Sequence, residues 1–494
     1  MFRLSSLLPT SLFASLSAPP PPPPSSDPPA SPTTMSGTED DSETASGAAF
    51  PFLRLPLELR EQVYSHYFHP GDHLVQNADL EARGFYGGVY RWDLSVLHVC
   101  KQVYAESKKV WRRENVFVKV ATPWPSAVLV NHISSEGLVP IVCTDAKADA
   151  FADHHAVVQI TAPFHGVVPE HTVVMLVDDL HLFTKTWYYS ALSYPMLNER
   201  LSTTFILRNP AKTGTEFSHD DDDDDVAAAT APGQKEGLGV PIALQKKLLL
   251  PFEHVKGLHG IRIYGYSSSV KAELARLQAL PVPSLQESLE SATDLMAAGD
   301  AALATHTPSK EDAAQRALDL YKQAFHAIHI LIHGRSRRVL ADVFFHDTIP
   351  SGRYAGQTGL TVRVILRLKL VARTIAAYNQ LAQWHESAFW GMRSAHILDD
   401  NFNPDFEAFL TNVLGAADVA LIYLRTAIAF WHMETHKEDW LGELIAYADE
   451  EMADSIKLWA KARAFLFRIS KNEVRAELKA YGVPQDVMEV FTDA

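Results

Sequence analysis

The chain contains only two cysteines, Cys100 and Cys143, among 494 residues. Two thiols cannot form the disulfide framework that stabilises small secreted domains, so we expect a reducing compartment, either cytoplasmic or nuclear. Long apolar runs are also absent, and no run approaches the roughly 20 residues that a membrane-spanning helix needs. The sequence therefore predicts a protein that neither relies on disulfide bonds nor inserts a helix into a membrane.

Positive charge is also in short supply. The 44 lysines and arginines are outnumbered by 59 aspartates and glutamates, so the formal net charge is −15. One run, Asp220–Asp225, supplies six of these negative charges. The remaining balance is mildly acidic, which argues against a nucleic-acid partner.

Recognisable catalytic motifs are missing as well. The sequence has no Gly-x-Ser-x-Gly turn, no phosphate-binding glycine-rich loop and no Cys-x-x-Cys pair. We therefore predict a protein that is not an enzyme and needs no cofactor.

The chain is long enough for several domains, because 494 residues exceed the usual size of one hydrophobic core. Residues 1–49 are rich in Pro, Ser and acidic side chains and are predicted to be disordered. Within them, Met1–Ala18 contains Arg3 and no acid, which weakly resembles a leader and leaves mitochondrial import open. Met35 begins a stretch typical of a cytosolic start, so translation from Met35 is a further hypothesis.

A helical signature in two halves follows. In the first half, Leu53–Phe68, Pro56 suits the first turn of a helix, and Leu59, Val63 and Tyr67 recur every four residues along one stripe. The second half, Leu97–Ser107, belongs to a helix whose apolar stripe is expected to comprise Val96, Cys100, Val103, Ser107 and Val110. A short β-type run, 116–120, comes after it.

This arrangement resembles the F-box, specifically the divergent F-box-like module common in fungal proteins. There a Leu-Pro-x-Glu-Leu-Arg opening is followed by a Leu-x-x-Val-Cys-x-Gln-x-x-x-Glu helix and an Asn-x-Phe strand. The match covers residues 50–120, with the insertion 70–93 where an ordinary F-box has a tight connection. The resemblance implies docking onto the Skp-type linker subunit of a cullin ubiquitin ligase through Leu55, Pro56, Leu59 and Val63. The alternative is that these residues only cover a hydrophobic core.

Between residues 121 and 280 the sequence predicts a mixed α/β domain. Short β-branched runs predict strands at 139–143, 157–161, 172–177, 203–207 and 260–264. Helices are expected at 187–197 and 271–279. An acidic and then Ala-, Gly- and Pro-rich stretch, 217–239, is predicted to be a disordered loop.

From residue 281 to 494 the pattern is helical. Alanines seven residues apart lie in amphipathic stretches with aromatic neighbours: Ala317/Ala324, Ala388/Ala395 and Ala420/Ala427. Small residues two turns apart let a second helix approach closely. This resembles a degenerate tetratricopeptide repeat array, whose stacked helix pairs leave a concave face for a peptide. A generic helical bundle is the alternative, because the spacing of the pairs is irregular. A long closing helix over 441–459 and a short helix after Pro484 are also expected.

Many such repeat domains bind a carboxyl-terminal peptide through a Lys/Asn clamp on the opening helix. The corresponding positions here are Met296 and Asp300, and an acid there would repel a carboxylate. A receptor for chaperone tails is therefore disfavoured.

Histidine spacing raises one catalytic hypothesis. His326, His329 and His333 could share one helix face and supply three zinc ligands, so a metal-dependent enzyme is a remote alternative. His432 and His436 lie one turn apart, but the Glu between them has the wrong offset for a zinc-protease motif. Helical histidines at such spacing are more often packing or surface residues.

The sequence therefore predicts an α+β, predominantly α protein that acts as a non-enzymatic adaptor. We expect F-box-like helices to engage a linker subunit and the helical repeats to hold a client protein. The alternative function is a scaffold or co-chaperone unrelated to ubiquitin.

Overall fold

The computed structural model describes residues 51–123, 131–165, 171–211, 236–305, 309–400, 416–436, 454–466 and 469–485. The chain divides into two compact units, Met1–Leu55 and Pro56–Ala494. In the first unit the described part is a short 3-10 helix, Phe52–Arg54, with the residues that flank it. The predictions for residues 1–49, and for 217–235 of the loop expected over 217–239, lie outside the described residues. The end of that loop, Glu236–Gly239, is a 3-10 helix in which Leu238 is buried, so the prediction of disorder is wrong there.

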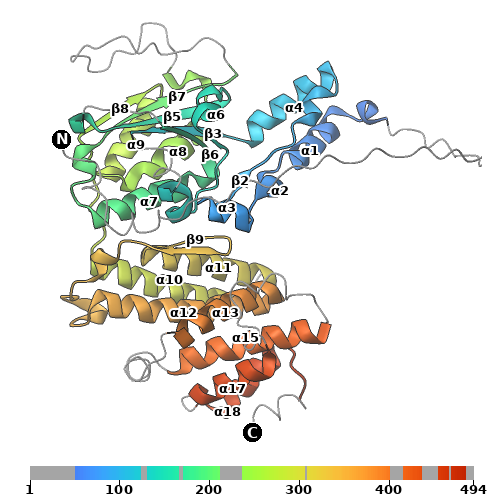
Figure 1. The fold of residues 1–494 in the computed structure, drawn as a ribbon, viewed down its shortest axis with the longest axis vertical. Helices are drawn as coiled ribbons and strands as arrows, with labels where there is room; N and C mark the ends of the chain where they lie inside the picture. Colours follow the sequence, from blue (N-terminus) through green and yellow to red (C-terminus); the bar gives the residue numbers. More distant parts are fainter. Residues whose placement is uncertain are drawn as a thin grey trace, which may run out of the picture. The chain divides into compact units, whose positions relative to one another are not determined.

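In the second unit, helices α1 (Leu57–Tyr67) and α4 (Lys101–Glu114) pack side by side (Figure 1). Helix α4 begins later than predicted, because Cys100 is its extended N-cap and its sulfur accepts a hydrogen bond from the Val103 backbone N–H at 3.5 Å. Cys100 is exposed, so the prediction that it lies on an apolar helix face is wrong. Val96 belongs to a separate 3-10 helix, η4 (Ser95–His98).

The insertion between the two halves is folded. It comprises helices α2 (Pro70–His73) and α3 (Ala78–Ala82) and the strands β1 (Leu74–Val75) and β2 (Val89–Tyr90). The two strands pair antiparallel, with Leu74 opposite Tyr90.

A six-stranded sheet follows, in the order β4-β6-β3-β5-β7-β8. Its strands are β3 (Phe117–Thr122), β4 (Cys143–Thr144), β5 (His154–Thr161), β6 (His171–Leu176), β7 (Ser202–Leu207) and β8 (Gly260–Tyr264). The pairs β3–β5 and β7–β8 are parallel and the others antiparallel. Burial alternates along β7, as expected for a sheet with one covered face.

The helices of this domain are α6 (Asp145–Ala150), α7 (Leu180–Ser193), α8 (Ile242–Leu249) and α9 (Ser268–Gln278). Side chains of α7, α8 and α9 share one hydrophobic core with the sheet. The strands predicted at 157–161, 172–177, 203–207 and 260–264 are confirmed. The strand predicted at 139–143 is wrong in extent, because β4 contains only Cys143 and Thr144.

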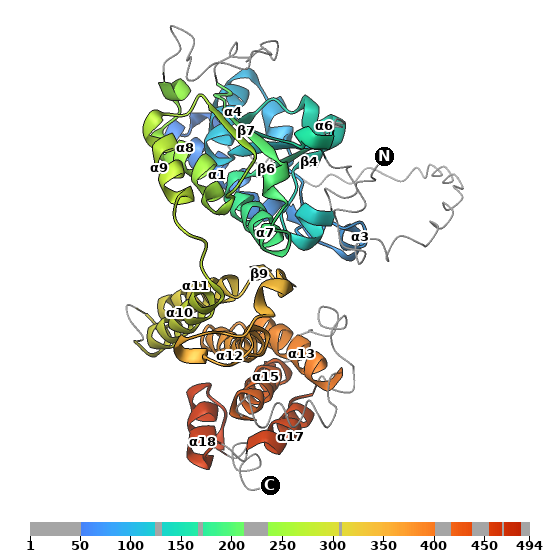
Figure 2. The ribbon, with the colours of Figure 1, turned by 90° about the vertical axis from the view of Figure 1, so that its left-hand side faces the viewer.

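The remaining described part is helical apart from one hairpin. Its helices are α10 (Leu285–Thr305), α11 (Lys310–Ala327), α12 (Gly359–Gln380), α13 (Trp384–Asp400), α15 (Ala416–His436), α17 (Ser455–Phe465) and α18 (Lys471–Ala480). From α10 to α17, each of these helices contacts the next one along the chain. Figure 2 shows α10 and α11 side by side, as Figure 1 does. The mixed α+β class with predominant helix is confirmed.

Small residues shape the helix contacts as the alanine spacing predicted. The six alanines of the three pairs are all buried. Gly299 on α10 lies against the Tyr321 ring of α11, and a Cβ atom at Gly299 would stand 2.3 Å from Tyr321 Cε1. The close approach of α10 and α11 therefore requires glycine at this position.

A β-hairpin corrects the prediction of continuous helix after residue 281. Strands β9 (Ile330–His333) and β10 (Ser336–Val339) pair antiparallel, with His333 opposite Ser336. Alternate residues of β9 face different cores: Leu331 belongs to the core of the sheet domain, and Ile330 and Ile332 belong to the helical core. This alternation follows from the two-residue period of a strand.

The prediction of one continuous closing helix over 441–459 is wrong in its last part, because a new helix, α17, begins at Ser455. Asp454 is the extended N-cap of α17, and its side chain accepts hydrogen bonds from the backbone N–H groups of Ile456 and Lys457. Residues 437–453, and most of the helix expected after Pro484, lie outside the described residues.

Candidate docking surface and basic cavity

Helix α1 is attached to α4 by a buried ion pair. Arg60 donates from Nε to Glu106 Oε2 at 2.9 Å and from Nη2 to Glu106 Oε1 at 2.6 Å. The Tyr64 hydroxyl also donates to Glu106 Oε2, at 3.2 Å. The two charged side chains are only 9% and 15% exposed, so the pair lies between the helices. The last residue of the Leu-Pro-x-Glu-Leu-Arg half therefore contacts the last residue of the Cys-x-Gln-x-x-x-Glu half.

The charges in this pair stabilise one another. The hydrogen bonds from Arg60, above all, lower the pKa of the Glu106 carboxyl to about 2. Burial, with a further contribution from Glu106, raises the pKa of the Tyr64 hydroxyl to about 12. At neutral pH, Glu106 is thus an anion that accepts from both side chains.

The insertion packs on the side of α1 and α4 that faces the sheet. Trp92 stacks on Tyr90 with ring centroids 4.9 Å apart and meets Trp111 of α4 edge-on at 5.1 Å. The Tyr90 hydroxyl donates to Asp179 Oδ2 at 2.9 Å, which connects the insertion to α7. Burial raises the pKa of the Asp179 carboxyl to about 7. The insertion is therefore a structural bridge between α4 and the sheet domain.

The opposite side of α1 is open. Leu59 and Val63 are 45% and 48% exposed, although Arg60 and Tyr64 on the other side are buried. Pro56 is exposed and Tyr67 is half-buried. The structure thus places Leu59 and Val63 on one accessible helix, with Pro56 as its N-cap. The fourth predicted docking residue, Leu55, is half-buried and belongs to the first unit.

Further apolar side chains next to α1 were not predicted as site residues. The Tyr67 hydroxyl lies 3.3 Å from Ser95 Oγ, which places η4 beside the end of α1. Around η4, Leu94 is 39% and Val99 is 68% exposed. Valine and leucine so exposed on a short segment are a surface that a partner protein can cover.

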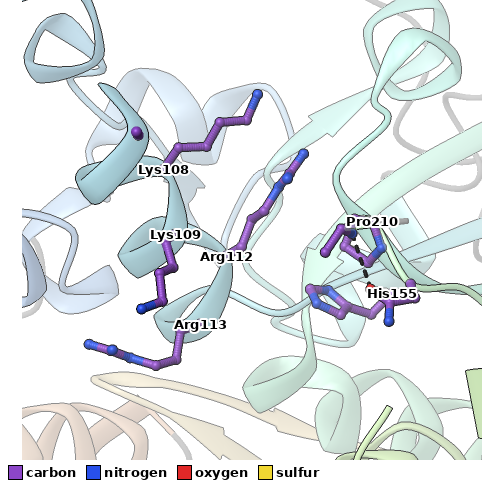
Figure 3. A pocket seen from close by; sticks show the side chains of 9 residues that line it. Lys108, Lys109, Arg112, Arg113, His155 and Pro210 are labelled. Carbon is purple, nitrogen blue, oxygen red and sulfur yellow. Dashed lines mark hydrogen bonds between the residues drawn. The ribbon is translucent and has the colours of Figure 1, made fainter. Parts of the chain in front are cut away.

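A basic cavity of about 340 Å³ lies on α4, and neither Leu59 nor Val63 lines it. Its lining residues are Ala105, Lys108, Lys109, Arg112, Arg113, His155, Asn209, Pro210 and Ala211. Lys108 and Arg112 extend from one side of α4 and Lys109 and Arg113 from the other (Figure 3). Four cationic residues thus line the cavity, and none of the described residues that line it is acidic.

The zinc hypothesis fails on geometry. Helix α11 ends at Ala327, so His326, His329 and His333 do not share one helix face. His326 Nδ1 lies 2.6 Å from Lys185 Nζ, and the His329 ring packs against the Tyr189 ring at 4.6 Å. Within the described ranges, no group of three or more His, Cys, Asp or Glu side chains is arranged to hold a metal ion.

The second histidine pair is also used in packing. The His432 ring stacks on Trp384 with centroids 3.8 Å apart, and its Nε2 lies 2.7 Å from the Tyr481 carbonyl oxygen. His436 Nδ1 lies 2.7 Å from the carbonyl oxygen of His432.

The position expected for a peptide clamp carries an internal ion pair. Asp300 accepts from Arg373 Nε at 2.8 Å and from the Tyr321 hydroxyl at 2.8 Å. Met296 is buried. Asp300 is therefore engaged in contacts within the helical domain.

Comparison with known proteins assigns no family. No protein-family model, curated protein or solved structure matches this chain. Among the residues that the structure describes, no helix is both long and apolar enough to cross a membrane.

Proposed function

We propose that this chain is a non-enzymatic adaptor that docks onto a helical partner through α1 and holds a client protein on its helical repeats. The main support is the contrast between the two sides of α1. One side is attached to α4 through Arg60 and Glu106, and the other presents Leu59 and Val63 half-exposed. Because the ion pair orients the helix, its apolar side chains are preorganised for a partner.

The partner that the F-box resemblance implies is the Skp-type linker subunit of a cullin ubiquitin ligase. The folded insertion supports this proposal, since it packs through Tyr90 and Trp92 toward the sheet and leaves Leu59 and Val63 accessible. The successive contacts from α10 to α17 support the client role, because an array of stacked helices offers one extended surface.

The test is a pull-down with the full chain and the purified linker subunit. The wild type is expected to bind the linker subunit at micromolar concentration. The affinity of the double variant Leu59→Asp, Val63→Asp should be at least about tenfold lower, because two charges would enter an apolar contact. The matched control is Ile456→Asp, which changes a 69% exposed apolar residue on α17. The Ile456→Asp chain should bind the linker subunit with the same affinity as the wild type.

Two outcomes would contradict the proposal. If the wild type does not bind the linker subunit, the ligase role is wrong and a scaffold or co-chaperone unrelated to ubiquitin becomes the better reading. If both variants lose binding, Leu59 and Val63 are not the docking residues. Affinity purification with mass spectrometry of the same three chains then identifies the client, because client peptides should persist in the double variant.

A further inference from the structure

The cavity on α4 is a positive region on an acidic chain. Four lysines and arginines of α4 line it, whereas the guanidinium of the neighbouring Arg208 lies 3.0 Å from His154 Nε2 and is not part of the lining. The carboxylates paired with the lining cations are Glu61, Glu114 and Asp153. Among the described residues, four cationic side chains thus stand against three carboxylates, although the whole chain carries a formal charge of −15. Such a local reversal of charge favours an anionic ligand.

The positive charges on the two sides of α4 are paired with acidic side chains to different extents. On the α1 side, Glu61 lies 3.0 Å from Arg113 Nη1 and 3.6 Å from Lys109 Nζ. Arg113 also contacts Glu114, at 3.1 Å. The charges of Lys109 and Arg113 are therefore largely balanced inside the protein.

On the side of α4 that faces the sheet, the positive charges of Lys108 and Arg112 are only partly neutralised by acidic side chains. Arg112 donates from Nε at 3.0 Å and from Nη2 at 2.6 Å to the single oxygen Oδ1 of Asp153, which orients its guanidinium. Lys108 Nζ donates to the neutral Tyr104 hydroxyl at 2.6 Å. Lys108 and Arg112 are one helical turn apart and extend in the same direction (Figure 3). Lys108 and Arg112 are thus accompanied by one paired carboxylate, that of Asp153, whereas Lys109 and Arg113 are accompanied by two.

His155 adds a polar group without adding charge. Its side chain lines the cavity and is 93% buried in the sheet, and its Nδ1 atom has no hydrogen-bond partner in the described part of the chain. Burial lowers the pKa of the imidazole to about 4, so the ring is neutral at physiological pH. The positive potential of the cavity therefore comes from α4.

We propose that this cavity binds a phosphate monoester between Lys108 and Arg112 of α4. A planar guanidinium and an ammonium group are the usual pair for a compact dianion, because the first donates in a fork and the second acts as a point charge. The apolar parts of the lining, Ala105, Pro210 and Ala211, then contact the group that carries the phosphate.

The lining argues against a nucleic acid as the source of the phosphate. Among the described lining residues there is no Phe, Tyr or Trp, and the His155 ring is buried, so these residues offer no exposed platform on which a base could stack. The basic row is about one turn long, so it offers a site for a single phosphate and not a track for a nucleic-acid backbone. A phosphorylated protein segment and a small phosphorylated metabolite both satisfy this chemistry.

The experiment measures binding to the full chain with separate probes for the two sources. The first probe is a degenerate peptide library with a central phosphothreonine, and its control is the same library with threonine. The second is glycerol 3-phosphate, with glycerol as its control. A single-stranded RNA oligonucleotide is the third. We expect saturable binding of the phosphorylated library or of glycerol 3-phosphate, and which one binds identifies the source.

The decisive variant is Lys108→Glu, which places an acid four residues before Arg112 and so retains a favourable helical pair. It should weaken phosphate binding at least about tenfold, because it removes a charged donor and adds repulsion. The matched control, Lys101→Glu, makes the same charge change at an exposed position of α4 outside the cavity and should stay within about twofold of the wild type.

Three results would overturn the proposal: no phosphate-dependent binding of either probe, equal loss in both variants, or tighter binding of RNA that Lys108→Glu abolishes. The proposal goes beyond docking at α1 and does not rest on it. Phosphate binding should persist in the Leu59→Asp, Val63→Asp chain, so failure of one proposal leaves the other standing.

Discussion

Arg60 and Glu106 form a two-point ion pair across 46 positions of sequence, with N–O distances of 2.9 and 2.6 Å. Each residue comes from one half of the signature that the insertion separates. The pair fixes which side of α1 faces α4, and thereby which side remains available to a partner. Gln102 strengthens the arrangement by donating to Glu106 Oε1 at 3.0 Å.

The first prediction concerns this pair. Glu106→Gln keeps the shape of the side chain but removes the negative charge that pairs with the buried guanidinium of Arg60. We expect a lower unfolding temperature, because breaking a buried pair exposes the desolvation cost of the remaining charge. Thermal denaturation followed by circular dichroism measures the change.

The matched control for the first prediction is Lys109→Gln on the same helix. Lys109 is 72% exposed and 3.6 Å from Glu61, so its loss should change the unfolding temperature less. Equal effects of the two substitutions would show that Arg60 and Glu106 do not hold the helices together.

The second prediction tests the contact between α10 and α11. Gly299→Ala places a methyl group against the Tyr321 ring, and we expect a loss of about 1–3 kcal/mol in the free energy of unfolding from overpacking. This loss should appear although alanine is favoured over glycine in helices by about 1 kcal/mol. Ala298→Ser, at an exposed position of the same helix, should stay within about 0.5 kcal/mol. Urea denaturation measures both, and a more stable Gly299→Ala chain would contradict the packing described here.

The third prediction tests the insertion as a structural bridge. Tyr90→Phe removes the hydroxyl that donates to Asp179, and we expect a loss of about 0.5–1.5 kcal/mol in the free energy of unfolding. Tyr194→Phe, at a 36% exposed position, is the control. If chemical denaturation finds the two variants equally stable, the hydrogen bond between Tyr90 and Asp179 contributes nothing.

The fourth prediction concerns pH. Burial lowers the pKa of His154, His155 and His333 to about 4 and that of His329 to about 3, and it lowers the pKa of His326 well below 6.5. The unfolded chain therefore binds more protons than the folded chain between about pH 4 and the ordinary value of 6.5. Stability from these groups is fully present above pH 6.5 and is lost as the pH falls.

Asp179 acts in the opposite direction, because its pKa is raised from 3.8 to about 7. Its contribution is fully present below pH 3.8 and is lost as the pH rises through about 7. Five histidines outweigh one aspartate, so we expect the free energy of unfolding to fall between pH 6.5 and 5, each histidine contributing up to about 1.4 kcal/mol per pH unit. Urea denaturation at pH 7, 6 and 5 tests this, and equal stability at pH 7 and 5 would contradict it.

A variant assigns part of this pH dependence to one residue. His329 lies among Tyr189, Phe344 and Phe345 with a φ of 55°, so we choose His329→Asn, because asparagine also adopts positive φ and does not titrate; it should flatten the dependence of stability on pH. His98→Asn, at an exposed position of η4, should leave the slope unchanged.

The sequence correctly predicted those secondary-structure elements whose apolar residues follow the period of a strand or of an amphipathic helix. The runs at 157–161 and 260–264 alternate or are β-branched, and both are strands. The helix predicted at 187–197 instead spans 180–193, because its first turns are buried nearly all round and show no amphipathic period. The sequence does not predict the β9–β10 hairpin, because the spacing of His326, His329 and His333 matches a helix face. The turn residue Gly334, with φ of 53°, is the signal that could have revealed it.

For the candidate docking site, the helical spacing of apolar residues in the sequence was enough to identify Leu59 and Val63. Helical periodicity can be read from the sequence because it depends on only a few neighbouring residues. It could not tell whether these residues face a core or solvent, because that depends on what packs against the helix. Tertiary structure decided it by pairing Arg60 with Glu106 and by turning the insertion toward the sheet. The basic cavity likewise exists only because folding places His155 and Asn209 opposite α4. Proximity of residues distant in sequence is a property of the packed chain and not of any local segment.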